Sequence, residues 1–191
     1  MEPETFWVNP FGVAWPTLKA SDLIRVDGSG AVVEGGPVRL LNAAGQLLHF
    51  LRQILLLITV PAFMIHHAVH SARPDANCVA HSHSIYGRTF CALGRPLDMI
   101  TQDSCAFYND LALYSSFRGI VLDSDEGNAI AAALGNKKAA LLQNHGLLTC
   151  GKTIEATIFW FMSLEKCCHS QLMADAAAGG RGGAVSTFAI C

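Results

Sequence analysis

Two histidines, His81 and His83, stand two positions apart in a short segment whose residues alternate in the way a β-strand does. Because side chains at positions i and i+2 of a strand share one face, both imidazoles would point the same way. One transition-metal ion, which binds histidine nitrogen at about 2.0–2.1 Å, could then bridge them. The spacing indicates half of a metal site, although histidine pairs also occur in strands for packing or surface reasons.

A third ligand is expected from His145, in the triplet Asn144-His145-Gly146. The triplet follows the apolar run Ala139–Leu142, which is typical of a central strand, so the histidine would emerge at a strand end. Gly146 would let the backbone turn sharply beside the ion. Three neutral imidazoles with an open position are typical of catalytic zinc sites, whereas structural sites are closed by four protein ligands. Such a metal could polarise a substrate carbonyl or enediol, or lower the pKa of bound water. The remaining histidines are interpreted as structural: His49, His66, His67, His70 and His169.

The elements that must position these histidines alternate between strand and helix, which favours an α/β layered domain. Predicted strands are Thr5–Val8, Asp22–Val26, Ala31–Val33, Asn77–Ser84 and Lys138–Gln143, with a tight turn at Asp27–Gly30. A first helix is predicted over 62–72 and is stopped by Arg73-Pro74-Asp75. A second begins with a capping box at 123–126 and ends at Gly135. A third, long helix runs from the cap Thr153 to about Asp175. The apolar residues of the long helix mostly keep helical spacing: Ile154, Ile158, Phe161, Met162 and Leu172. The segment Leu47–Ile58 could be a buried helix or a strand, and its periodicity does not choose.

Composition bounds the size and the partners of the protein. The chain has 191 residues, of which 51% are hydrophobic, and a formal net charge of −2. This length suits a single domain, which we expect over residues 1–178, followed by a loose Gly-rich tail at 179–191. Because the chain has no Lys/Arg block, a nucleic-acid role has no electrostatic support, and small, roughly neutral metabolites suit the surface better.

The cysteines and the apolar segments indicate which cellular compartment the sequence favours. The seven cysteines include no C-x-x-C pair, so neither a disulfide framework nor a thiolate zinc site is indicated. We expect reduced thiols in a cytoplasmic protein. The acidic start Met1–Glu4 does not resemble a signal peptide. The apolar stretch Leu47–Ile65 is interrupted by polar and charged residues, which leaves about a dozen uncharged positions where a bilayer span needs roughly 20. No membrane role is therefore expected.

Two histidine-containing blocks resemble a known family. The stretch Ala72–Ser84, Ala-Arg-Pro-Asp-Ala-Asn-Cys-Val-Ala-His-Ser-His-Ser, resembles the R-P-D-x-x-x-V-x-H-x-H block of the class II aldolase/adducin head-domain family. Gln143–Gly146 resembles the N-H-G block of that family, and Ser21–Gly28 with Val32–Gly35 is similar to its early hairpin. The resemblance covers residues 5–44 and 62–178. It implies His81, His83 and His145 as metal ligands, and an α/β/α sandwich of three layers around a mixed, largely antiparallel sheet. It also implies a homo-oligomer, often a tetramer with the site at a subunit interface.

Three departures from the family pattern limit what the resemblance implies. The sugar-phosphate aldolases of the family carry a catalytic Glu four residues before a His, and these positions are Ala62 and His66 here. Alanine cannot transfer a proton, so classical aldol cleavage would need another carboxylate. Asp103 is the candidate for this second carboxylate, and the simpler interpretation is that it is a solvated loop residue. Tyr108 is a candidate for an acid that donates a proton near the site, and the alternative interpretation is that its ring only packs against other residues.

The other two departures concern segments of the chain. The family's N-terminal helices and Gly-Asn-x-Ser phosphate loop would precede Thr5, and this sequence does not contain them, so a phosphate-bearing substrate would lose its usual backbone cradle. The leucine-rich segment 45–61 has no counterpart in the family pattern, and we interpret it as a possible insertion. Sequencing of the mature transcript would test this, since a transcript that retains the segment would count against the idea.

The sequence thus predicts a metal-dependent lyase of the aldehyde-lyase type, acting on a small carbonyl or hydroxy-carbonyl compound by aldol cleavage, epimerisation or decarboxylation. Zinc is the expected ion, with Fe(II), Mn or Co as alternatives, and Fe(II) would suit an oxidative decarboxylase. Two rival hypotheses are a non-catalytic adducin-like module of the actin/spectrin membrane skeleton and an inactive, truncated remnant. The intact histidine triad and the lack of a long Lys-rich tail speak against the adducin-like module.

Overall fold

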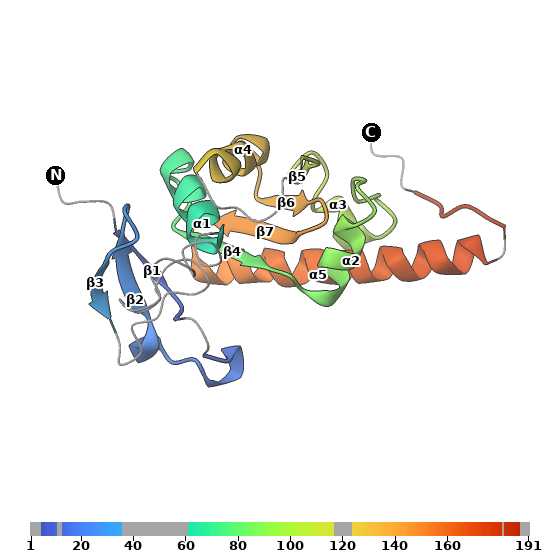
Figure 1. Cartoon of the computed structure of the whole chain (residues 1–191). Helices are drawn as coiled ribbons and strands as arrows, with labels where there is room; N and C mark the ends of the chain where they lie inside the picture. The colour runs from blue at the N-terminus through green and yellow to red at the C-terminus, as the bar shows by residue number, and fades with distance from the viewer. Residues whose placement is uncertain (1–4, 11–12, 36–60, 117–123, 181, 188–191) are drawn as a thin grey trace, which may run out of the picture. The chain divides into compact units, whose positions relative to one another are not determined.

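The computed structural model describes residues 5–10, 13–35, 61–116, 124–180 and 182–187 (Figure 1). These residues form two compact units. The first unit comprises Met1–Ala68 with Arg118–Asn128, and the second comprises Val69–Phe117 with Ala129–Cys191. The predicted element Leu47–Ile58 and residues 45–60 of the possible insertion lie outside the described residues, whereas Pro61 begins a helix.

The first unit contains a small antiparallel sheet in the order β1-β2-β3. Its elements are β1 (Thr5–Val8), the 3-10 turns η1 (Trp15–Thr17) and η2 (Ala20–Asp22), β2 (Ile24–Asp27) and β3 (Val32–Gly35). The predicted turn between β2 and β3 is confirmed. The Asp27 carboxylate accepts hydrogen bonds from the backbone N–H groups of Ser29 and Ala31, and Gly30 has a φ of 81°, which favours glycine. The core of this unit is a cluster of Ile24, Val26 and Phe63.

The second unit contains a four-stranded sheet in the order β4-β7-β6-β5. Its strands are β4 (Cys78–Ser82), β5 (Leu111–Tyr114), β6 (Ala139–Leu142) and β7 (Gly146–Gly151). The β4–β7 and β6–β7 pairs are antiparallel and the β5–β6 pair is parallel. The predicted mixed, largely antiparallel sheet is therefore confirmed.

Five α-helices lie in the described part of the chain: α1 (Pro61–Ala72), α2 (Ile85–Cys91), α3 (Gln102–Cys105), α4 (Ser124–Leu134) and α5 (Ile154–Gly179). Both α2 and α5 pack on the same sheet, where they share a core with strand residues such as Leu141 and Leu147. Because Ala140 and Leu142 point the other way from β6 and are also fully buried, the opposite face is covered too. In Figure 1 the part of α4 within this unit lies on the other side of the sheet from α5. This arrangement agrees with the predicted layers of an α/β/α sandwich.

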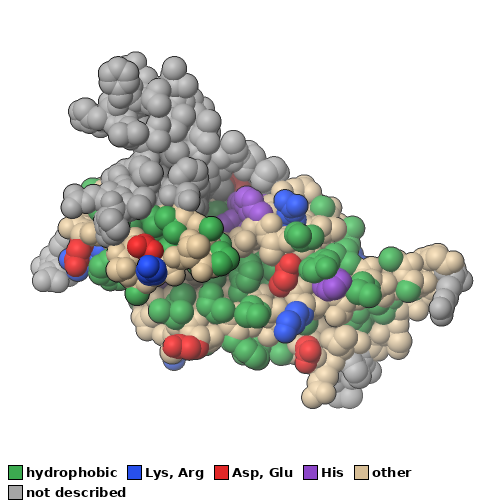
Figure 2. Space-filling model, turned by 90° about the horizontal axis from the view of Figure 1, so that it is seen from below, with side chains coloured by type: hydrophobic (Ala, Val, Ile, Leu, Met, Phe, Trp, Pro, Cys, Tyr) green, Lys and Arg blue, Asp and Glu red, His purple; other side chains and the backbone are tan. Residues whose placement is uncertain are grey.

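The long helix α5 begins at its predicted cap, and only part of its predicted apolar set is buried. Phe161 and Leu172 pack against the core, whereas Ile154, Ile158 and Met162 are exposed. The side chain of Thr153 accepts a hydrogen bond from the N–H of Ala156. The buried residues of the helix are Thr157, Leu164, Cys167, Cys168 and Gln171. Its exposed residues include several large apolar side chains: Ile154, Ile158, Phe159, Met162 and Met173. Figure 2 shows hydrophobic side chains gathered on the face of the molecule seen from below. No helix in the part of the chain that the structure describes meets the length and apolarity of a membrane span.

The Arg73-Pro74-Asp75 motif connects the segment before β4 to the segment before β6. The Arg73 guanidinium donates to the carbonyl oxygens of Gly135 at 2.8 Å and Lys137 at 2.9 Å. It also pairs with Asp75, which lowers the pKa of that carboxyl to about 2. The predicted end of α1 is confirmed at Ala72, and the motif helps to fix the two strands that precede the histidine segments.

Candidate metal centre

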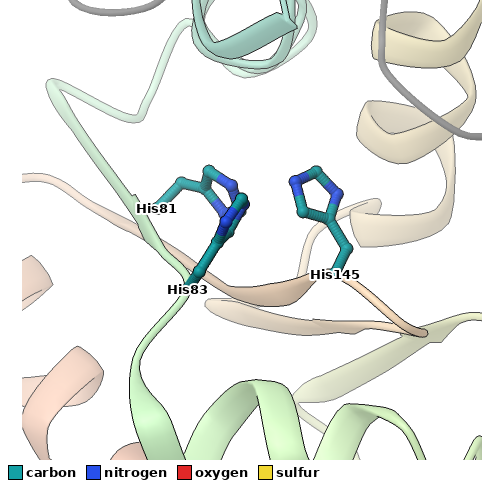
Figure 3. Close-up of side chains that lie close together, drawn as sticks. All are labelled: His81, His83 and His145. Atoms are coloured by element: carbon teal, nitrogen blue, oxygen red, sulfur yellow. The ribbon is translucent and has the colours of Figure 1, made fainter.

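The structure brings together the three histidines that the sequence singled out. His81 lies in β4, His83 follows the end of this strand, and His145 lies in the turn between β6 and β7 (Figure 3). Their candidate ligand atoms all lie within 4.8 Å of one another, and the ring centroids are 4.7–5.2 Å apart. Two nitrogens on one tetrahedral zinc ion are about 3.3 Å apart. Small side-chain rotations would therefore suffice to place all three nitrogens around one ion.

Strand register places His81 on the side of the sheet that faces away from α5. His81 pairs with Leu148 on β7, and directly opposed residues share a face. The next residue of β7, Thr149, points the other way, and its hydroxyl lies 3.1 Å from the carbonyl oxygen of Thr157 in α5. The imidazole and the α5 core are thus on opposite faces of the sheet.

A backbone hydrogen bond orients the His81 ring. Its Nδ1 lies 2.9 Å from the carbonyl oxygen of Leu147. Because a carbonyl oxygen only accepts, Nδ1 carries the proton and the lone pair resides on Nε2. Histidines that bind metals usually donate their other ring N–H to a carbonyl or carboxylate in this way, which fixes the orientation of the ring. The sequence could not indicate Leu147, because any residue supplies a carbonyl and only the β4–β7 register selects this one.

The turn that carries His145 differs from the prediction in the residue that bends it. The residue with positive φ is Asn144, at 56°, and the N–H of His145 donates to the carbonyl of Leu142 at 3.0 Å. Gly146 is needed for a different reason. A Cβ atom at Gly146 would lie 2.5 Å from the carbonyl oxygen of Ser82, so only glycine lets β7 approach β4 this closely. The glycine thereby keeps the His145 turn beside the His81–His83 segment.

Burial and neighbouring charges lower the pKa values of two of the three imidazoles, those of His83 and His145. Burial, and to a smaller extent the neighbouring His83, lowers the pKa of His145 to about 4. The pKa of His83 is also lowered, first by burial and then by the charge of Arg88. At neutral pH both rings therefore keep a nitrogen lone pair, as a metal ligand must. In the described residues no other group of three or more His, Cys, Asp or Glu side chains has this spacing.

The other two predicted site residues lie away from the triad within one chain. Tyr108 is 48% exposed and precedes β5, whose first residue pairs with Ala139 at the start of β6, whereas His145 follows the far end of β6. Asp103 lies on α3, which packs against α5, and its charge acts on the buried thiol of Cys167. The structure thus does not join either residue to the histidines of the same chain.

Comparison with known proteins agrees with this geometry. The class II aldolase and adducin N-terminal domain family model matches residues 1–172. The chain belongs to this family. Decarboxylase NovR of Streptomyces niveus is 42% identical over 91% of this chain, and mouse alpha-adducin is 33% identical over 94% of it. The matched regions make up 58% of NovR and 22% of the adducin, so this class II aldolase chain spans less than two thirds of these relatives.

Solved structures confirm the class II aldolase fold. The structure of L-fuculose 1-phosphate aldolase from Glaciozyma antarctica PI12 has a TM-score of 0.77 and 44% identity, covering 97% of this chain and 63% of that one. A class II aldolase superfamily protein from Pseudomonas syringae has a TM-score of 0.78 and 33% identity, covering 94% and 65%.

Proposed function

We propose that this class II aldolase family member is a metal-dependent lyase that acts on a small carbonyl or hydroxy-carbonyl compound. The observation that carries the proposal is the convergence of the three imidazoles of His81, His83 and His145. Three neutral nitrogen ligands leave a coordination position open, which is the arrangement of a catalytic ion. A structural role would be expected to close the site with a fourth protein ligand, and no such side chain stands in the described cluster.

The donor set fits a divalent transition ion. Imidazole nitrogen suits zinc, and it also suits Fe(II) and Co, while Mn prefers more oxygen ligands. Zinc is therefore our first choice, with the other three ions as alternatives. When bound, such an ion would act as a Lewis acid that stabilises negative charge on a substrate oxygen. The chain's own contribution is to hold three oriented imidazoles, with His81 fixed by the Leu147 carbonyl.

The residue at position 62 favours decarboxylation over classical aldol cleavage. In decarboxylation of a 3-oxo acid, the bond between C2 and the carboxylate breaks, its electron pair moves toward the C3 carbonyl to form an enolate, carbon dioxide leaves, and water supplies a proton to C2. This sequence of steps needs no carboxylate base, which suits Ala62. Two relatives are named for related reactions: NovR as a decarboxylase, and a Streptomyces roseochromogenus protein, 41% identical, as a prenylphenylpyruvate oxygenase and prenylbenzoate synthase. With Fe(II) and molecular oxygen, an oxidative decarboxylation would use the same triad.

A homo-oligomer is part of the proposal. The exposed apolar residues of α5, such as Ile158 at 41% and Phe159 at 59%, form a surface suited to burial against a second copy. A proton-transfer role for Asp103 or Tyr108 would require such a copy to carry the residue to the triad. We keep the cytoplasmic location as a prediction.

The rival function is an adducin-like interaction module, which is favoured by the 33% identity to alpha-adducin. An activity screen separates the two. Protein loaded in turn with Zn, Mn, Co and Fe(II) would be assayed for carbon dioxide release from 3-oxo acids, for carbon dioxide release from 2-oxo acids with Fe(II) and oxygen, and for cleavage of L-fuculose 1-phosphate, beside a His145→Ala variant. We expect turnover that chelation abolishes, that metal restores and that the variant lacks. Metal-loaded protein that is inactive throughout the panel would favour the interaction module, and protein that takes up none of the ions would contradict the proposal.

A further inference from the structure

We infer that Glu165, on α5, is a positioning residue that holds two of the three histidine segments in place for the ion. This inference rests on the proposed function, because it assigns Glu165 a role in metal binding. Glu165 itself does not touch the candidate ligands: α5 lies on the opposite face of the sheet from His81. Its effect would pass through α2, the helix that follows His83 directly.

The Glu165 carboxylate replaces the missing N-terminal cap of α2. Ser84 is the N-cap residue, but its side chain makes no capping hydrogen bond to the helix. Instead its hydroxyl donates to the carboxylate of Glu165 at 2.5 Å. The N–H groups of Tyr86 and Gly87 donate to the same carboxylate at 3.0 and 2.7 Å. One side chain thus satisfies three donors that would otherwise need separate partners.

This contact fixes the chain immediately after His83. On its N-terminal side, His83 is preceded by Ser82, which pairs with Leu147 in the sheet. On its C-terminal side it is followed by Ser84, which the hydrogen bond to Glu165 holds. His83 itself lies outside both elements, so these two flanking contacts are what define its backbone position.

The same helix also reaches the turn that carries His145. At the last residue of α2, the carbonyl of Cys91 accepts from the N–H of Asn144 at 3.3 Å. The Cys91 thiol lies 3.3 Å from the carbonyl oxygen of Gly146 and donates to it. Both neighbours of His145 are therefore bonded to the end of a helix whose beginning follows His83. A shift of α2 would change the distance between the two imidazoles.

The charge of Glu165 makes the contact a strong one. A carboxylate at a helix N-terminus is favoured by the helix dipole, and hydrogen bonds to a charged acceptor are stronger than neutral ones. The glycine at position 87 lets α2 pack against β7, because a Cβ atom there would lie 2.4 Å from the Leu147 side chain. The same Cβ atom would lie 2.7 Å from the Ser84 hydroxyl that donates to Glu165. Loss of a residue that orients metal ligands typically weakens metal binding by about 10–100-fold.

The test compares Glu165→Gln with a matched change on the same helix. Asp175→Asn removes another carboxylate of α5, which pairs with Arg95 at 2.7 Å and has no contact to α2 among the bonds described. Full-length wild type and both variants would be titrated with Co(II), whose visible absorption spectrum reports ligand geometry. The melting temperature of each metal-free protein would be measured alongside.

We expect Glu165→Gln to raise the dissociation constant for Co(II) about tenfold and to change the bound spectrum. Asp175→Asn should leave both unchanged. Glu165→Ala should weaken binding further, and if it fails to fold, Glu165→Gln still provides the test because the amide keeps the size and one acceptor. Wild-type affinity and spectrum in Glu165→Gln, with only a lower melting temperature, would overturn this inference alone. A wild-type protein that binds no Co(II) would overturn the proposed function as well.

Discussion

The two sheets of the molecule differ in how deeply their residues are buried. In the four-stranded sheet every residue of β6 is buried, as are the first five residues of β7. Three of them, Ala139, Leu141 and Leu147, belong to a large core shared with α2 and α5. In the three-stranded sheet, β1 and β3 contain no buried residue, and the core is a cluster of three. A deeply packed scaffold holds side chains to small displacements, which a metal centre requires.

The histidines of the two units differ in their surroundings. The candidate ligand atoms of His81, His83 and His145 lie within 4.8 Å of one another, beside the ends of β4 and β6. His67, in the first unit, instead packs its ring against Phe63 and Phe6, at centroid distances of 5.4 and 6.4 Å. The surroundings of a histidine, and not its presence alone, therefore separate a candidate ligand from a packing residue.

The largest expected effect is on metal affinity, and it contrasts these two kinds of histidine. His83→Ala removes one of three ligands and should weaken zinc binding by more than about 100-fold, beyond the usual cost of losing an orienting residue. His67→Ala should leave zinc affinity unchanged. Competition with a chromophoric chelator would measure both. Equal losses in the two variants would remove the distinction between the two regions.

The next effect tests the packing of the four-stranded sheet. Leu141 is fully buried in the core with α5, and Leu141→Ala should lower the free energy of unfolding by about 2–5 kcal/mol through lost burial and the cavity left behind. Urea denaturation of metal-free protein would measure it. A loss below about 1 kcal/mol would mean that this core is looser than its burial indicates.

A smaller effect is expected in the three-stranded sheet. Ile24 is fully buried, but its cluster is small, and Ile24→Val removes one methylene group at a cost of about 0.5–1.5 kcal/mol. Zinc affinity should not change. The same denaturation and chelator assays apply, and a zinc affinity that falls with Ile24→Val would show that the centre depends on this sheet.

The smallest effect concerns the pH dependence of stability. The hydrogen bond and charge of Arg73 lower the pKa of Asp75 to about 2, whereas an unfolded aspartate has a pKa of about 3.9. A depressed folded pKa gives stability that is present above about pH 4 and is lost as the pH falls toward 2. Asp75→Asn should reduce the fall in melting temperature between about pH 4 and pH 2, as measured by thermal melts. The same fall in melting temperature in the variant and the wild type would show that the ion pair between Arg73 and Asp75 does not contribute to stability.

The sequence predicted the features that depend on local patterns. The β2–β3 turn followed from Asp27 and Gly30, the start of α5 from Thr153, and the end of α1 from Arg73-Pro74. The approach of His81 to His83 followed from strand periodicity, and the joining of His145 to them followed from the family resemblance.

Features that depend on long-range contacts were not predicted. The helix α2 has seven residues, contains Gly87, and is capped by Glu165 about 80 positions away, so no local signal marked it. The strand β7 was also missed, and with it the Leu147 carbonyl that orients His81. Asp103 and Tyr108 were chosen by residue type, which carries no information on which end or face of a sheet a loop reaches.

The most direct test of the metal centre is X-ray absorption spectroscopy of the zinc-loaded, full-length protein. The account predicts three imidazole nitrogens at about 2.0–2.1 Å, with the remaining position taken by a light atom such as water oxygen. One imidazole should be lost from the signal in His145→Ala. A first shell that contains sulfur at about 2.3 Å, or fewer than three imidazoles in the wild type, would contradict it.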